Sequence, residues 1–221
     1  PEGTEIHTIQ PVGEHHVLYV QNGKPAKVMV MNIAKQKVVH EFMIPYPEKG
    51  SVHGQFRNAR LTSKGTLLVA NMAMGFVAEY NAKGKELHRW ELFGPWSATE
   101  LPNGNILMVG RKGPVKEVMR DGTVVWETNT TQYGVDSPQK AYRLKNGNTV
   151  ITNWFNEWNK TAVATFNPSR APLQMIELTP DGHVAWEVSS WKGDRNLGPA
   201  TTFQLLDEPV VRKDCRFGRF K

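Results

Sequence analysis

The chain of 221 residues is long enough to bury a sizeable core, and its 27 Lys and Arg against 21 Asp and Glu leave a formal net charge of +6 that weakly favours anionic partners. The basic residues are scattered, with neither a basic helix nor zinc-finger spacing, so we expect no nucleic-acid partner. No apolar run reaches the roughly 18 residues of a membrane span, and a single cysteine excludes an intrachain disulfide.

Four segments in chain order share one pattern of apolar runs and Gly turns. The first turn of each segment reads "PVGEHHVLYV", "SKGTLLVA", "PNGNILMVG" and "KNGNTVITN" in turn, the first copy being the weakest. Gly or Asn-Gly between two apolar runs is typical of a tight β-hairpin. The second turns lie in "IAKQKVVHEF", "NAKGKELHRW", "MRDGTVVWE" and "TPDGHVAWEV". Each segment is therefore expected to form four strands, over residues 4–46, 51–93, 95–129 and 137–190.

The first-turn glycines recur about every 40 to 50 residues, which is the repeat length of a four-stranded propeller blade. A β-sandwich also has short strands and Gly turns, but it does not explain this period. We predict an all-β fold, a β-propeller of four-stranded antiparallel blades. Residues 197–209 are expected to form the inner strand of a partial fifth blade, and residues 210–221 a C-terminal tail. About four and a half blades suit a larger ring of six to eight, with the N-terminal blades outside this chain, better than a closed four-bladed disc.

Two stretches, "DGTVVWE" and "DGHVAWEV", resemble the repeats of quinoprotein alcohol dehydrogenase-like propellers. The longer stretches "VHGQFRNARL", "NGNTVITNW" and "LGPATTFQLLDEP" are similar to bacterial PQQ-like repeat proteins of poorly defined activity. The resemblance implies a propeller fold, and pyrroloquinoline quinone (PQQ) is the cofactor of the related dehydrogenases. Because this chain has no adjacent cysteine pair and no assignable set of calcium ligands, no cofactor is expected and PQQ is not favoured.

Long loops are expected on one face of the propeller. The loops that join successive blades open on the same face as those between the second and third strands, and the opposite face receives only short turns. Loops over a rigid scaffold commonly carry function, so we predict a binding site on this long-loop face. Its aromatic residues are expected to stack on a sugar or flat ligand or, alternatively, to pack the long insertion 153–172 onto the disc. The candidate ligand-binding residues of these loops are Trp96, Asn153, Trp154, Trp158 and Trp191.

Polar residues at aligned inner-strand positions are expected near the propeller axis. Cations that repeat around an axis repel one another unless carboxylates or a bound anion lie among them. These polar residues are predicted either to form an internal ring of salt bridges that includes Glu100 or to bind a sulfate, carboxylate or uronate. One register comprises Arg60, Glu100, Arg143 and Gln204; the other, three residues earlier, comprises Arg57, Ser97, Lys140 and Thr201.

His53 is expected at the start of an inner strand on the long-loop face, where a neutral imidazole beside Arg57 could act as a general base or nucleophile. His53 and Arg57 are therefore the candidate catalytic residues, and the alternative for His53 is a hydrogen-bonded histidine at a strand start. His7 occupies a comparable strand in the first segment. Because no Asp or Glu has matching spacing, no metal site is expected.

The sequence favours a ligand-binding propeller that recognises a carbohydrate or another anionic organic molecule. Two alternatives stay open. One is an enzyme that acts on acidic or sulfated substrates, either arylsulfotransferase-like or a glycan lyase or hydrolase, as in related propeller folds. The other is a protein-interaction scaffold. The chain begins with Pro1 instead of Met, as a mature, processed or truncated product would. We expect a periplasmic or secreted location.

Overall fold

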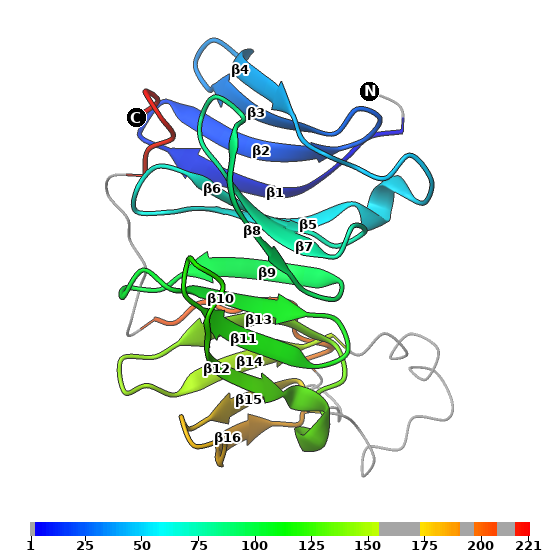
Figure 1. Ribbon diagram of the computed structural model, residues 1–221, viewed down its shortest axis with the longest axis vertical. Coiled ribbons are helices and arrows are strands. Elements are labelled where there is room, and N and C mark those ends of the chain that lie inside the picture. The colour runs from blue at the N-terminus through cyan, green and yellow to red at the C-terminus, as the bar shows by residue number, and fades with distance from the viewer. Residues whose placement is uncertain (1–2, 155–172, 191–196, 207–214) are drawn as a thin grey trace.

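The computed structural model describes residues 3–154, 173–190, 197–206 and 215–221, which form four four-stranded antiparallel sheets (Figure 1). The strands of each sheet are neighbours in chain order, so each sheet is a continuous meander. The described residues contain no α-helix and two 3₁₀ helices, η1 (Val52–Gly54) and η2 (Thr130–Tyr133). The predicted all-β fold of four-stranded blades is confirmed. The sheets comprise β1 (Glu5–Val12), β2 (His16–Asn22), β3 (Lys27–Asn32) and β4 (Lys37–Met43); β5 (Phe56–Leu61), β6 (Leu67–Asn71), β7 (Phe76–Tyr80) and β8 (Glu86–Glu91); β9 (Pro95–Glu100), β10 (Ile106–Gly110), β11 (Pro114–Val118) and β12 (Val124–Asn129); and β13 (Pro138–Arg143), β14 (Thr149–Asn153), β15 (Met175–Leu178) and β16 (Val184–Val188).

The sheets follow one another along the longest axis of the molecule, from β1–β4 at one end to β13–β16 at the other (Figure 1). The first strand of each sheet packs against the first strand of the next, as inner strands around a propeller axis do. Because the first and fourth sheets lie at opposite ends, the described residues form an open row of blades and not a closed four-bladed disc. None of the described segments forms a helix with the length and apolar character that a membrane span requires.

Apolar side chains fill the spaces between neighbouring sheets. Every residue of β6, β7, β10 and β14 is buried. Sheets cover both faces of β6, β7 and β10, which accordingly are largely apolar, whereas β14 belongs to the last sheet and contains Thr149, Thr152 and Asn153. The Asn-Gly turns of the third and fourth blades place Gly104 at φ 86° and Gly147 at φ 90°, a conformation that glycine adopts without a Cβ clash. The blades therefore repeat along the chain at the spacing of these glycine turns.

Aromatic side chains on the fourth strands tie each blade to the next. His40 Nε2 lies 2.6 Å from the carbonyl oxygen of Ala82, and Trp90 Nε1 donates to the carbonyl of Met119 at 3.3 Å. Trp126 Nε1 donates in the same way to the carbonyl of Pro180 at 3.1 Å. These contacts join a fourth strand to the second turn of the following blade. They give the recurring aromatic residue a structural role that requires no ligand.

Residues 197–206 lie beside the fourth sheet. The amide of Ala200 donates to the carbonyl of Asn153 at 3.1 Å, and the Lys140 ammonium donates to the Thr202 hydroxyl at 3.2 Å. Residues 197–206 form no strand of the expected fifth blade, and residues 207–209 of the predicted range lie outside the described residues.

Residues 215–221 cover the turn ends of the first two sheets. The amide of Gly13 donates to the carbonyl of Cys215 at 2.7 Å, and the amide of Gly218 donates to the carbonyl of Gly65 at 3.3 Å. The Phe217 side chain is fully buried in the core between these sheets. This part of the predicted tail therefore acts as a latch between two blades.

Replacing Phe217 by alanine is expected to lower the free energy of unfolding by about 3 kcal/mol, because a fully buried phenylalanine leaves a cavity when it is truncated. Urea denaturation of the full chain measures the change. The matched control is Arg219→Ala, which removes an exposed tail side chain stacked on Phe220 and should cost less than about 1 kcal/mol. Equal stability of Phe217→Ala and the unmodified chain would show that the latch does not contribute.

Candidate functional site

A cavity of about 590 Å³ lies where the inner strands of the four blades begin, on the predicted long-loop face. Side chains from β1, β5, β9 and β13 form most of its wall, and η1, the end of β14 and residues 201–202 complete it. The lining residues are His7, His53, Arg57, Asn58, Arg60, Trp96, Ser97, Gln139, Lys140, Trp154, Thr201 and Thr202.

All four inner strands have a register irregularity at the same level. It falls at His7 in β1, Arg57 in β5, Trp96 in β9 and Gln139–Lys140 in β13. An extra residue in one strand of a pair bends the strand and redirects a side chain, and such bulges are common beside binding sites. The bulged residues all line the cavity, so the same local distortion in four blades supplies its functional groups.

Three cations enter the cavity. Arg57 stacks over the Trp96 ring, with its guanidinium carbon 4.8 Å from the ring centre. Arg60 donates to the Thr8 hydroxyl at 3.2 Å and to the carbonyl of Ala59 at 2.9 Å. Among the described residues, Lys140 donates to the Thr202 hydroxyl, and its ammonium lies 5.8 Å from the centre of the Phe203 ring. These hydrogen bonds hold the cations in place without neutralising them.

No Asp or Glu lines the cavity in the part of the chain that the structure describes, and none of the three cations forms an ion pair there. Burial lowers the pKa of Arg57 and of Arg60, and Glu5 nearby partly opposes the change at Arg57. The pKa of Lys140 is also lowered, first by burial and then by the charge of Arg60. The cavity therefore destabilises its own cations when no anion is present.

Two residues of the register that includes Arg60, namely Glu100 and Arg143, contribute to packing between blades. Glu100, at the far end of β9, accepts a hydrogen bond from the Ser63 amide at 2.5 Å and pairs with Arg120 at 2.7 Å. Arg143 lies 3.2 Å from a Glu117 carboxylate oxygen, and its guanidinium stacks on Trp126. Neither Glu100 nor Arg143 lines the cavity. Glu100 pairs with Arg120 of its own blade, and Arg143 pairs with Glu117 of the preceding blade. We therefore assign both to blade packing in place of the predicted ligand binding.

Asn153 is likewise a structural residue. Its side chain is 1% exposed, accepts from the Ser137 amide at 3.0 Å and donates to the carbonyl of Leu173 at 2.7 Å. Asn22 and Asn71 end the second strands of their blades in the same way, with amides that donate to loop carbonyls. The recurrence of Asn at this position was the sequence signal for a role in blade geometry.

The predicted aromatic surface is described in part. Trp96 and Trp154 line the cavity, so both are available to contact a ligand there. Trp158 and Trp191 lie outside the described residues, as does most of the insertion that follows Trp154.

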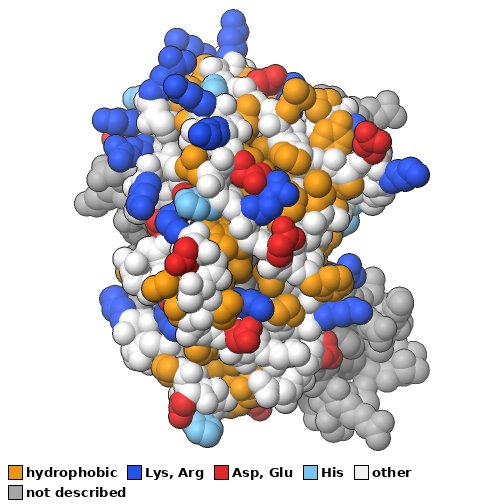
Figure 2. All heavy atoms as spheres, in the orientation of Figure 1, with side chains coloured by type: hydrophobic (Ala, Val, Ile, Leu, Met, Phe, Trp, Pro, Cys, Tyr) orange, Lys and Arg blue, Asp and Glu red, His pale blue; other side chains and the backbone are white. Residues whose placement is uncertain are grey.

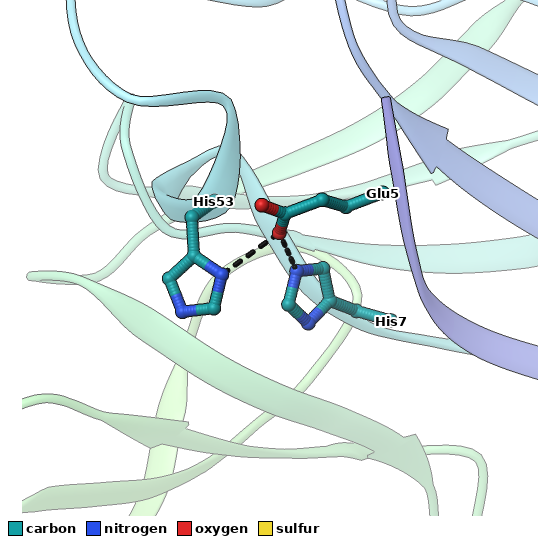
Figure 3. A group of neighbouring side chains, drawn as sticks. All are labelled: Glu5, His7 and His53. Atoms are coloured by element: carbon teal, nitrogen blue, oxygen red, sulfur yellow. Dashed lines mark hydrogen bonds and ion pairs between the residues drawn. The ribbon is translucent and has the colours of Figure 1, made fainter. Parts of the chain in front are cut away.

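His53 and His7 meet at one side of the cavity, joined by a carboxylate that the sequence analysis missed. Glu5 Oε2 lies 2.8 Å from His53 Nδ1 and 2.7 Å from His7 Nε2 (Figure 3). These hydrogen bonds, the one from His7 foremost, lower the pKa of Glu5. Glu5 and His7 are two residues apart on one strand, and the alternation of side chains along a strand could have predicted that they share a face.

No protein-family model and no curated protein matches the chain. Solved structures do resemble it. A protein of unknown function from Bacteroides caccae is 23% identical, with a TM-score of 0.68 over 88% of this chain and 71% of that chain. Virginiamycin B lyase from Staphylococcus aureus is 17% identical, with a TM-score of 0.61 over 88% of this chain and 58% of that chain.

The WD40 β-propeller domain of Doa1 is 16% identical, with a TM-score of 0.53 over 66% of this chain and 47% of that chain. The chain thus spans less than two thirds of the length of the lyase and of the WD40 domain. At these identities the likeness concerns the fold alone. Together with the four meander sheets, it shows that this chain has a β-propeller fold.

Proposed function

We propose that the cavity at the start of the inner strands binds an anionic organic molecule, best fitted by a sugar acid or another ring that carries a carboxylate or sulfate. The observation that carries the proposal is the group of three partly buried cations, Arg57, Arg60 and Lys140, that face one cavity without a carboxylate in its described lining. Buried charges are normally paired, because an unpaired one loses hydration without compensation. An anion would supply the missing partner and could accept bidentate hydrogen bonds from a guanidinium.

The remaining lining suits the uncharged part of such a ligand. The rings of Trp96 and Trp154 offer apolar faces for a sugar ring or a flat ring to pack on. Asn58, Gln139 and Thr201 offer amide and hydroxyl groups of the kind that bind sugar hydroxyls. A cavity of about 590 Å³ lies within the range of about 300 to 1,000 Å³ that is typical of small-molecule sites.

Basic side chains also gather elsewhere on the molecule. Figure 2 shows several Lys and Arg side chains at the end of the molecule that carries the first sheet and the C-terminus. That surface is open to water, where exposed charges are screened and bind anions weakly. A test of the proposal must therefore separate the cavity from this surface.

We further propose that the chain is a PQQ-like repeat protein, the more specific family that its sequence resembles, and that it is periplasmic or secreted. Its support is the position of the resembling stretches, because "DGTVVWE" and "DGHVAWEV" lead into the fourth strands β12 and β16 at the same place in two blades. A family assignment of this kind describes the repeat and names no substrate.

A second candidate function is acid–base chemistry on an acidic glycan. It is favoured by the hydrogen bond between Glu5 and His53, because a carboxylate that holds an imidazole in place is a common way to orient a general base. Lyases are among the solved propellers that resemble this chain, which is compatible with this function and does not assign it. The protein-interaction scaffold stays a prediction without a specific structural observation in its favour.

The test is a calorimetric titration of the full chain with matched pairs of compounds, galacturonate against galactose and an aryl sulfate against the parent phenol. We expect saturable binding of the acid in at least one pair and at least tenfold weaker binding of its neutral counterpart, because one charge-assisted hydrogen bond contributes about 1.5 to 3 kcal/mol. Equal or undetectable binding of both members in every pair would contradict the proposal. Formation of an unsaturated product from polygalacturonate would favour the enzyme.

A further inference from the structure

Three metal-binding side chains converge beside the cavity from two different blades. Glu5 and His7 project from β1, and His53 projects from η1, which precedes β5 (Figure 3). Their ligand atoms all lie within 4.8 Å of one another. The two imidazole rings are in edge contact, with their centres 5.0 Å apart and their planes at 66°.

The backbone fixes the direction from which each side chain approaches. His7 lies at the bulge of β1, which turns its ring toward the cavity. His53 lies in a short 3₁₀ helix whose start is capped by Ser51. The Ser51 hydroxyl accepts a hydrogen bond from the His53 amide at 3.2 Å. The His7 side chain is 21% exposed and those of Glu5 and His53 are 41% and 59% exposed, so the cluster is half open to solvent on one side.

We propose that Glu5, His7 and His53 form a site for a divalent transition-metal ion such as Zn²⁺, with at least one coordination position open toward the cavity. Two imidazoles and one carboxylate are a common ligand set for zinc and for iron(II) with open positions, and imidazole nitrogens favour late transition metals over Mg²⁺ or Ca²⁺. The proposal concerns side chains outside the cation group and is independent of whether the cavity binds an organic anion.

Two of the three separations between the ligand atoms must grow slightly, and the third, between the two histidine nitrogens, is at most 4.8 Å. Bonds of about 2.0 to 2.2 Å in tetrahedral geometry separate neighbouring ligand atoms by roughly 3.3 Å. Glu5 Oε2 now lies 2.7 Å and 2.8 Å from the two histidine nitrogens, so each separation must grow by about half an ångström. The ion would take the place of the protons through which the imidazoles now donate to Glu5, and the exposed side chains have room to make this shift.

Arg57 opposes the ion. One of its guanidinium nitrogens lies 3.5 Å from His7 Nδ1, on the side of the ring away from Glu5. When a metal binds Nε2 of a neutral histidine, Nδ1 carries the proton and prefers an acceptor, whereas Arg57 presents a donor and a positive charge. Removing the Arg57 charge should therefore strengthen metal binding at this site. Nonspecific binding of metal ions to exposed histidines would not be strengthened in this way.

The test is a titration of chelator-treated full chain with ZnCl₂ by calorimetry and with CoCl₂ by visible absorption. We expect one metal ion per chain, at least tenfold weaker binding in His7→Gln and in His53→Gln, and severalfold tighter binding in Arg57→Met. His183→Gln is the matched control, because His183 also lies near a carboxylate, at 3.3 Å from Asp181, but on an exposed turn. Cys215→Ser checks the single thiol.

Thermal unfolding provides the second readout. Zinc should raise the unfolding temperature of the unmodified chain and of the two controls but not that of Glu5→Gln or His53→Gln, whose metal-free unfolding temperatures report whether these variants are folded. The proposal is overturned if the unmodified chain shows no saturable binding in the micromolar range. It is also overturned if the His7 and His53 variants bind as the unmodified chain does, or if His183→Gln or Cys215→Ser abolishes binding.

Discussion

Replacing Lys140 by methionine is expected to weaken binding of an anionic ligand by at least tenfold while raising the free energy of unfolding by about 1 kcal/mol. Both effects follow from one cause. Lys140 is partly buried near Arg60, and among the described residues it contacts the Thr202 hydroxyl and the Phe203 ring but no carboxylate, so its charge costs stability when no ligand is bound. Arg60→Met should behave in the same way, because burial also penalises its charge. Titration with the acid that binds in the panel above, together with urea denaturation, measures the two quantities.

The double variant sharpens this prediction. If Arg60 and Lys140 repel each other, each single substitution removes the repulsion, and the double variant should gain less stability than the two single gains combined. Lys83→Met is the control, since Lys83 lies on an exposed turn of the second blade and should change neither quantity. A Lys140→Met variant that is less stable and binds the acid as before would show that the cations are structural.

The second large effect is expected at a buried cluster between the second and third blades. Arg120 pairs with Glu79 and with Glu100, whose side chains are 1% and 3% exposed. Arg120→Met would leave two buried carboxylates without their cation and should lower the free energy of unfolding at neutral pH by about 3 to 5 kcal/mol. Chemical denaturation at pH 7 measures this loss. Lys116→Met, which breaks an exposed pair with Glu127 at 3.0 Å, should cost less than about 1 kcal/mol.

The pH dependence of this variant has a definite sign. Burial alone would raise the pKa of Glu100, but the Ser63 and Arg120 hydrogen bonds outweigh it and lower the pKa. In the unmodified chain Glu100 therefore adds stability that is lost as the pH falls through its folded pKa. Without Arg120 its folded pKa should rise, because two of the influences that lower it are removed, so Glu100 then contributes less stability above that pKa. The cost of Arg120→Met should thus be larger at pH 7 than at pH 4, and an equal cost at both would contradict this account.

The repeat was predictable because local signals repeat with it. Asn-Gly turns such as those at Gly104 and Gly147 demand positive φ, and apolar runs on both sides demand burial, so turn chemistry and burial pattern indicate the same four-stranded unit. The structure places the second register of inner-strand residues, which includes Arg57 and Lys140, around one cavity, because equivalent positions in successive blades face the same axis.

The failures have physical causes as well. Glu100 and Arg143 share aligned positions with Arg60, yet contacts across blades hold both: Glu100 accepts from the Ser63 amide of the second blade, and Arg143 pairs with Glu117 of the third. The bulges at His7 and Arg57 depend on how two strands pair, and the single sequence carries no signal for them. Glu5 lies on the same strand as its partner His7, so equivalent positions in successive blades do not reveal the pair.

The most direct test of the central claim, that the cavity binds an organic anion through its cations, is a crystal structure of the full chain soaked with 4-iodobenzoate, whose iodine is located by anomalous scattering. We expect the carboxylate to lie within hydrogen-bond distance of at least two of the cations Arg57, Arg60 and Lys140. The ring should pack against Trp96 or Trp154. Binding of the anion only at exposed basic residues such as Arg216 or Arg219, with none in the cavity, would contradict it.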